Sequence, residues 1–226
     1  MTARSGVLLG IDTSTRQSVV VAGRGAVSSI SRRAVGHRHG AHVLEQVEEA
    51  LSAAGASLPD VEAIAVGTGP GSFTGLRVGL ATAKTLAYVR GLPLIGVSST
   101  DALRLAAVTA GASANAAVIL PAGAHDHYLA LPGREAMLVA PGGLEAALGG
   151  DEAVAVDIDA GFLGAPAAER GAAALAGLPA ALLELAGRRL ALGEADDAAT
   201  LTPAYVALPR GVSATAEDAG WSPDLR

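Results

Sequence analysis

The 226-residue sequence contains no cysteine, which excludes disulfides, thiolate metal sites and a cysteine nucleophile. Half of the residues are hydrophobic, yet no uninterrupted apolar run reaches the roughly 18 residues needed to span a bilayer. The apolar stretch in the N-terminal segment MTARSGVLLGID is too short for a signal peptide. Together these absences predict a cytoplasmic protein without a membrane segment.

The chain also lacks the positive charge of a nucleic-acid-binding domain. Its formal net charge is −6, which argues against a large nucleic-acid surface of its own. A chain of this length has room for one large domain or two small lobes around a real core. We therefore expect a protein with a real core and without a large nucleic-acid surface of its own.

The most informative stretch runs from Ala63 to Arg90 and reads as a strand, a glycine-rich turn and a helix. The run at 63–66 is apolar enough for a buried strand, and Ser72 or Thr74 is placed to cap a helix that ends before Gly91. The residues that we select as a candidate site in the turn and the first helical turns are Gly69, Pro70, Gly71, Ser72, Phe73, Thr74, Gly75 and Arg77.

A glycine-rich turn between a strand and a helix also suggests phosphate binding. The Walker A ending Gly-Lys-Ser/Thr is absent, and the single lysine, Lys84, lies far down the helix. The Rossmann spacing fails at its third glycine, because Gly67 and Gly69 are followed by Gly71. We expect a structural turn that exposes a helix N-terminus, with mononucleotide binding as the alternative.

The helix after this turn is apolar on two sides. Its charges, Arg77 and Lys84, share one narrow stripe. One apolar face consists of Leu76, Gly79, Leu80, Ala83 and Ala87, and the other of Val78, Thr82, Leu86 and Val89. One face can lie on the strands, so the other needs a second helix or another protein.

A second amphipathic helix is predicted over residues 42–54. It carries Glu45, Glu48 and Glu49 away from its apolar face and ends at Gly55, and we expect it to lie beside the first helix. The candidate partner interface on the two helices consists of Val43, Leu44, Val47, Leu51, Val78, Leu80 and Lys84.

The N-terminal strands predicted at residues 6–11 and 18–22 are joined by Asp12-Thr13-Ser14-Thr15. An acidic residue and hydroxyl groups at this point resemble the first phosphate loop of actin-like ATPase folds. Those folds usually have Asp-x-Gly-Thr, and Ser14 stands where the glycine would be. We therefore interpret Asp12, Thr13 and Ser14 as a degenerate phosphate loop, with a simple hairpin that has a polar turn as the alternative.

The histidine-bearing segment from Arg32 to His42 is interpreted as a loop or helix entry with solvated side chains. Its His37, His39 and His42 do not form the HExxH pattern, and no nearby carboxylate supplies a general base. We predict no metal site in this chain.

The rest of the sequence predicts an N-terminal lobe over 1–110, a smaller lobe over 111–210 whose last segment returns to the first, and a disordered tail over 211–226. A helix over 102–110 is expected to be capped by Ser99-Thr100-Asp101. Further strands are expected at 27–31, 93–97, 117–120, 128–131, 136–139 and 153–156, helices at 144–148 and 179–192, and a strand or extended segment at 202–208.

Three strings together resemble the TsaB family, also called YeaZ, and the match in order covers roughly residues 6–105. They are Gly10-Ile-Asp-Thr-Ser-Thr15, Gly67-Thr-Gly-Pro-Gly-Ser-Phe-Thr-Gly-Leu-Arg-Val-Gly79 and Pro93-Leu-Ile-Gly-Val-Ser98. The closing Pro203-Ala-Tyr205 is similar to the family's C-terminal segment. The middle departs, because His125-Asp126-His127 stands where the family has an Asp-Ala-Arg run.

The resemblance implies an α/β actin-like (ASKHA) fold of two lobes with a degenerate nucleotide site. It implies a non-catalytic subunit that forms a heterodimer with TsaD and is joined by TsaE. That complex makes N6-threonylcarbamoyladenosine (t6A) at position 37 of tRNAs reading ANN codons. The chain would form a homodimer when alone, reach tRNA only through the complex and hold no cofactor of its own, with any ATP or ADP bound at the level of the complex.

Two other functions are weighed on the same residues. A self-sufficient actin-like ATPase or kinase needs two phosphate loops and an adenosine site, and the sequence offers one degenerate loop. A metallopeptidase needs metal ligands with a general base, and the sequence offers only clustered histidines. The non-catalytic partner needs an apolar helix pair and no intact site, so we prefer it.

Overall fold

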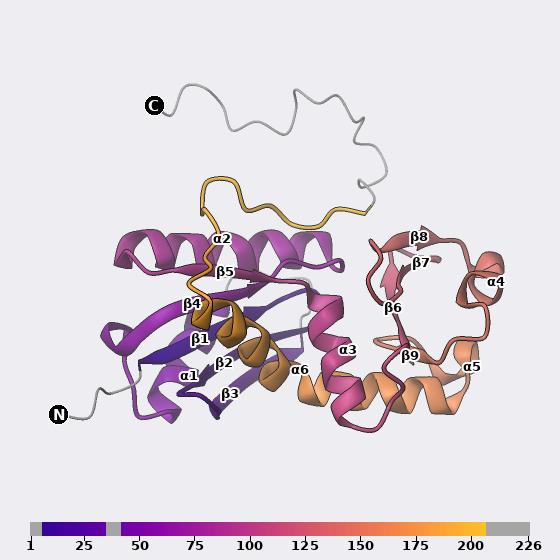
Figure 1. Ribbon diagram of the computed structural model, residues 1–226, viewed down its shortest axis with the longest axis horizontal. Helices are drawn as coiled ribbons and strands as arrows, with labels where there is room; N and C mark the ends of the chain where they lie inside the picture. The colour runs from indigo at the N-terminus through magenta and orange to yellow at the C-terminus, as the bar shows by residue number, and fades with distance from the viewer. Residues whose placement is uncertain (1–5, 35–41, 207–226) are drawn as a thin grey trace.

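The computed structural model describes residues 6–34 and 42–206, which form two β-sheets with helices between and around them (Figure 1). The larger sheet has the order β3-β2-β1-β4-β5. Its strands are β1 (Val7–Asp12), β2 (Gln17–Gly23), β3 (Val27–Ala34), β4 (Val61–Gly67) and β5 (Leu94–Val97). β1 pairs antiparallel with β2 and parallel with β4. Every residue of β1 is buried, as its unbroken apolar run predicts for a strand covered on both faces.

Two helices, α1 (Val43–Ala53) and α2 (Phe73–Arg90), cover one face of the larger sheet. Their inner side chains share a core with alternate residues of the strands, such as Leu9 and Ile64. The short 3₁₀ helix η1 (Leu58–Asp60) leads from α1 into β4. The two helices also contact each other, as the sequence predicted for these neighbours.

The smaller sheet has the order β8-β7-β6-β9. Its strands are β6 (Ala117–Ala122), β7 (Asp126–Ala130), β8 (Met137–Val139) and β9 (Ala153–Ala155). One face is covered by α4 (Leu144–Leu148) and α5 (Ala160–Leu163), around the buried Ile119 and Leu129. The exposed 3₁₀ helix η2 (Pro141–Gly143) leads into α4.

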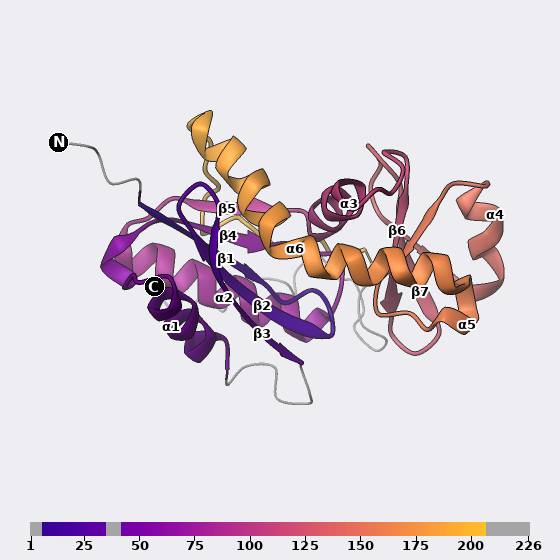
Figure 2. The same ribbon diagram turned by 90° about the horizontal axis from the view of Figure 1, so that it is seen from below.

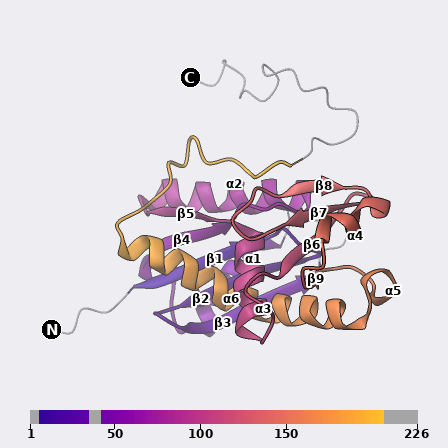
Figure 3. The same cartoon turned by 45° about the vertical axis from the view of Figure 1, so that its right-hand side comes forward.

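The helices α3 (Ser99–Thr109) and α6 (Ala165–Ala191) lie between the two sheets and join them into one core (Figures 1 and 3). Leu103 of α3 and Leu178 of α6 are fully buried in a cluster that includes Val21 of the large sheet and Val118 of the small one. Within the described residues, no helix is long and apolar enough to cross a membrane.

The helix α6 contains Pro179 and bends in the middle, as the view from below shows (Figure 2). Proline has no N–H, so the carbonyl of Leu175, four residues earlier, loses its helical partner. Arg32 of β3 replaces that donor. Its guanidinium nitrogens Nη1 and Nη2 donate to the carbonyls of Leu175 at 2.8 Å and Ala176 at 2.6 Å.

The chain after α6 runs back over β5 toward α2 (Figure 3). Asp196 forms a β-bridge with Leu94, accepts a hydrogen bond from Gly96 N at 2.6 Å and pairs with Arg189 at 2.9 Å. Further along, Ala204 N donates to the carbonyl of Thr68 at 2.8 Å. These contacts place Tyr205 beside the N-terminus of α2.

Most elements agree with the sequence predictions, and four details are corrected. The helix predicted from Pro179 begins at Ala165, so the proline lies inside it. The helix α3 is capped by Ser98, not Ser99, because the Ser98 hydroxyl accepts from Asp101 N. Residues 202–206 form no strand, and 207–208 lie outside the described residues. The supposed loop from Arg32 is strand through Ala34.

Candidate functional site

The turn between β1 and β2, the predicted degenerate phosphate loop, lies inside the protein. Asp12, Thr13, Ser14 and Thr15 are each at most 4% exposed. Their polar atoms are therefore cut off from water and must find partners within the chain.

Asp12 has three such partners. The backbone N–H and the hydroxyl of Ser14 both donate to its Oδ1, at 2.9 and 2.7 Å, and the hydroxyl of Ser99 donates to its Oδ2 at 2.7 Å. Burial raises the pKa of the Asp12 carboxyl above its ordinary 3.8, while these hydrogen bonds oppose the rise. Ser99 also accepts from Gly69 N at 3.0 Å, so Asp12 connects the end of β1 to the glycine-rich turn and to α3.

The glycine-rich turn closes directly over the β1–β2 turn. Ser72 N donates to the carbonyl of Ser14 at 2.7 Å, and the Thr13 hydroxyl donates to the carbonyl of Gly75 at 2.7 Å. A Cβ atom on Gly75 would lie 2.1 Å from the Thr13 carbonyl oxygen, and one on Gly71 would lie 2.1 Å from that of Ser14. These glycines let two backbones approach more closely than any side chain would allow.

The same turn sets the start of α2. The Ser72 hydroxyl accepts from Gly75 N at 3.2 Å and caps the helix, which confirms one of the two predicted caps. Gly69 and Pro70 are buried and joined by a cis peptide bond, whereas Thr74 is exposed.

Arg77 lies one turn into α2 and is held by two aromatic rings. Its guanidinium carbon is 4.0 Å from the centre of the Phe73 ring, and its Nε donates to the Tyr205 hydroxyl at 3.0 Å. The Phe73 and Tyr205 rings are 5.1 Å apart. Within the turn and the first helical turns, Gly71 and Ser72 therefore contact Ser14, whereas Phe73 and Arg77 contact Tyr205 of the returning C-terminal segment.

The predicted partner interface needs correction. Val43, Val47, Leu51 and Leu80 are at most 5% exposed and belong to the core between the helices and the sheet. Val78 and Lys84 are partly exposed, while Leu44 is 57% exposed. The two-sided character of α2 is confirmed, because the face with Leu80 is buried and the face that ends at Val89 reaches solvent.

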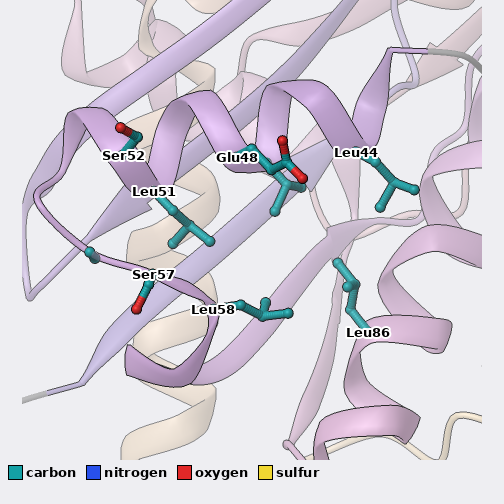
Figure 4. Close-up of a pocket in the computed structure, with 9 residues that line it drawn as sticks. Leu44, Glu48, Leu51, Ser52, Ser57, Leu58 and Leu86 are labelled. Carbon is teal, nitrogen blue, oxygen red and sulfur yellow. The ribbon is translucent and has the colours of Figure 1, made fainter.

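The outer surface of α1 and α2 contains an apolar groove of about 360 Å³ (Figure 4). Leu44 of α1, Leu58 of η1 and Leu86 of α2 line it, and Val47 and Leu51 form its floor with small exposed fractions. Near the end of α2, Tyr88 is 84% and Val89 72% exposed. We use the name outer helix surface for Leu44, Leu58, Leu86 and Val89.

The histidines do not form a metal site within the described part of the chain, where no cluster of three possible ligands occurs. His42 pairs with Glu45 at 3.1 Å, and His37 and His39 lie outside the described residues. His127 of β7 is buried and stacked on Phe162 at 4.7 Å, and burial lowers the pKa of its ring. His125 is exposed in the turn before β7, and Asp126 is the half-buried first residue of that strand.

Sequence reasoning missed Ser99, Tyr205 and Asp157 as partners of the candidate site. Ser99 was assigned to a helix cap, although its hydroxyl instead reaches Asp12. Tyr205 meets Arg77, and Asp157 meets Arg16, across more than a hundred residues of sequence. No local sequence pattern predicts such pairings, because only the fold brings these residues together.

Comparison with known proteins gives consistent results for sequence and fold. The family described as "TsaD: tRNA N6-adenosine threonylcarbamoyltransferase" matches residues 26–155. The tRNA threonylcarbamoyladenosine biosynthesis protein TsaB of Haemophilus influenzae is 36% identical over 129 residues, which are 57% of this chain and 54% of that protein. The Escherichia coli protein of the same name is 38% identical over 92 residues, 41% of this chain and 40% of that one. The chain thus spans about half the length, or less, of these curated relatives.

The fold comparison extends further along the chain. A solved structure described as an uncharacterized protein with similarity to peptidase YEAZ, from Pseudomonas aeruginosa, superposes with a TM-score of 0.67 at 25% identity. The superposition covers 89% of this chain and 100% of the Pseudomonas aeruginosa chain. The predicted actin-like α/β fold is thereby confirmed.

Proposed function

This chain belongs to the TsaD family of tRNA N6-adenosine threonylcarbamoyltransferases, where its relatives are TsaB or YeaZ proteins, and we propose that it is a non-catalytic subunit of a TsaD-containing complex. That complex forms t6A at position 37 of tRNAs reading ANN codons. In this proposal the chain binds TsaD as a heterodimer, is joined by TsaE, and meets tRNA only through the complex. It works in the cytoplasm and holds no nucleotide of its own.

The observation that carries the non-catalytic role is the enclosure of the β1–β2 turn. A phosphate-binding turn needs backbone N–H groups that point into open space. Here the Ser14 N–H and hydroxyl are bonded to Asp12, and the Ser72 N–H at the start of α2 is bonded to Ser14. The groups that would hold a phosphate are engaged within the protein, which supports a structural use of this turn.

The partner role is supported by the outer helix surface. Large apolar side chains gathered on a protein surface typically mark an interaction site. Leu44 and Val89 are both more than half exposed, and the groove beside Leu44 is a concave site that could hold an apolar side chain. Two such helix pairs packed together would bury the usual interface area of about 1,600 Å². We therefore propose that this surface pairs two copies when the chain is alone and TsaD when TsaD is present.

The test is binding of purified TsaD to three forms of this chain, measured by analytical ultracentrifugation. Leu44→Glu adds a charge to the groove and should weaken binding at least about 100-fold, as is typical for the loss of an interface hot spot. Ile30→Glu is the matched control. Ile30 is 44% exposed but lies on β3, on the sheet face opposite to Ser29 and Ser31, which contact α1. Val47 and Leu80 are unsuitable because charges there would disrupt the core.

The proposal predicts that Ile30→Glu binds TsaD like the wild type, while Leu44→Glu remains folded and fails to bind. Equal binding by all three forms would move the interface away from the outer helix surface. Wild-type protein that ignores TsaD at micromolar concentrations would refute the partner role itself.

The non-catalytic role makes a separate prediction for the isolated protein. Its release of phosphate from ATP should not exceed the buffer level, and it should cleave no peptide. Turnover near the roughly 1 per second of ordinary enzymes, abolished by Asp12→Ala, would establish the alternative of a self-sufficient ATPase.

A further inference from the structure

One hydrogen bond joins the β1–β2 turn of the large sheet to the small sheet. The backbone N–H of Arg16 donates to Oδ2 of Asp157 at 2.6 Å. Arg16 lies between β1 and β2, whereas Asp157 follows β9, so the pair spans both halves of the molecule. A short bond between an amide and a carboxylate is charge-assisted and stronger than a neutral one.

The Arg16 amide differs from the other polar groups of its turn. Ser14 bonds to Asp12 and Ser72, and the Thr15 hydroxyl bonds to the backbone of Gln17. These partners come from the large sheet and its own loops. The donor that faces the small sheet is the Arg16 N–H, and its acceptor is an anionic oxygen.

Asp157 holds that oxygen in place with an unusual backbone conformation. Its φ is 58°, and no other described residue except glycine has a positive φ. Aspartate tolerates this left-handed region better than most residues, but the conformation persists only where its surroundings hold it. Neighbouring Asp159 has ordinary geometry with φ −65° and makes no side-chain hydrogen bond to the helix it precedes.

We propose that the Asp157 carboxylate is a built-in anionic ligand of the β1–β2 turn. It occupies the Arg16 amide in place of a free phosphate or carboxylate group and ties the small sheet to the large one. A backbone amide in a tight turn is a usual donor to such anions, so removing the carboxylate should leave a donor open to one. The inference does not rest on the partner role, because no partner protein takes part in its test.

The test compares the full-length chain with Asp157→Gly and Asp159→Gly by NMR of the backbone amides. Glycine at 157 removes the carboxylate and accepts the positive φ without strain. Asp159→Gly makes the same chemical change two residues away. We expect the Arg16 amide to exchange with solvent about tenfold faster or more in Asp157→Gly only, as for an amide that has lost its bond. We also expect inorganic phosphate to shift the Arg16 resonance saturably in that variant and not in the wild type.

Each result decides the proposal. Equal Arg16 exchange in Asp157→Gly and Asp159→Gly would overturn the tie between the sheets. Faster exchange without a phosphate shift would overturn the ligand role, as would a wild type that binds phosphate at Arg16 equally well. If Asp157→Gly fails to fold, Asp157→Asn replaces it, because it keeps an acceptor oxygen of the same shape and removes only the charge. A neutral hydrogen bond is weaker than a charge-assisted one, so the Arg16 amide should still exchange faster than in the wild type, and exchange at the wild-type rate would overturn the proposal.

Discussion

The β1–β2 turn and the outer helix surface both belong to the large sheet and the helices that cover it. They differ in whether their side chains are bonded within the chain or exposed to solvent. In the turn, Asp12 and Ser14 have the residue types of a phosphate loop, but each polar group is bonded within the chain. On the outer helix surface, Leu44 and Val89 are exposed without a covering element among the described residues. The motif residues are thus bonded within the chain, whereas the apolar side chains that our proposal assigns to a partner are open to solvent.

The largest effect expected from this comparison is on Gly75. If the turn is a structural joint, Gly75→Ala should lower the free energy of unfolding by about 3 kcal/mol or more, because the new methyl group would overlap the Thr13 carbonyl oxygen. Gly187→Ala in α6 is the matched control. Nothing lies within 4 Å of a Cβ atom there, so it should stabilise the protein by about 0.5–1 kcal/mol. Urea unfolding measures both changes in the free energy of unfolding. A Gly75→Ala variant as stable as the wild type would contradict the close packing of the glycine-rich turn on the β1–β2 turn.

Asp12 sharpens the comparison through pH. Its pKa is raised in the folded state by burial, so its contribution to stability is complete below the ordinary value of 3.8 and is lost as pH rises through the folded pKa. Asp12→Asn removes this titration. The stability of the wild type relative to Asp12→Asn should therefore fall as pH rises above about 4, by at most about 1.4 kcal/mol per pH unit. Thermal unfolding at a series of pH values measures it, and a constant difference would contradict the burial of an ionisable Asp12.

A smaller effect is expected at the bend of α6, which holds the two sheets together. Arg32→Met removes the donor to the carbonyl that Pro179 leaves free and should cost about 1 kcal/mol. In a Pro179→Ala background the helix can make its own bond, so the same substitution should cost less. A double-mutant cycle in urea measures the coupling. Equal costs in both backgrounds would mean that Arg32 does not serve the bend.

The sequence predicted the order of strands and helices well, because each early element carries its own signal. The buried face of α2 follows from the three- to four-residue spacing of Leu76, Leu80 and Ala83, and the end of the helix follows from Gly91. The first half of α6 was missed because Gly171 and Pro179 resemble breaks. In the structure, Gly171 is needed where α6 touches the backbone of Ala155, which lies in a strand that no local pattern connects to the helix.

The candidate site was predicted in composition but not in arrangement. The spacing of Val47 and Leu80 places each on an apolar face of its helix. It cannot show which apolar face packs on the large sheet, and in the structure both residues do. The Asp12 loop was recognised from its residues, whereas its closure depends on Ser99 and on the close approach of Gly71 and Gly75. Such contacts between distant segments exist only after folding.

The most direct test of the account is t6A formation in a reaction reconstituted with TsaD, TsaE, ATP, the threonylcarbamoyl adenylate that donates the transferred group, and a tRNA that reads ANN codons. Asp12→Asn and Leu44→Glu would each replace the wild-type chain, at a temperature where circular dichroism shows both variants folded. The account predicts that Asp12→Asn supports t6A formation at close to the wild-type rate and that Leu44→Glu does not. Loss of t6A with Asp12→Asn and its retention with Leu44→Glu would contradict the account and place the function in the turn.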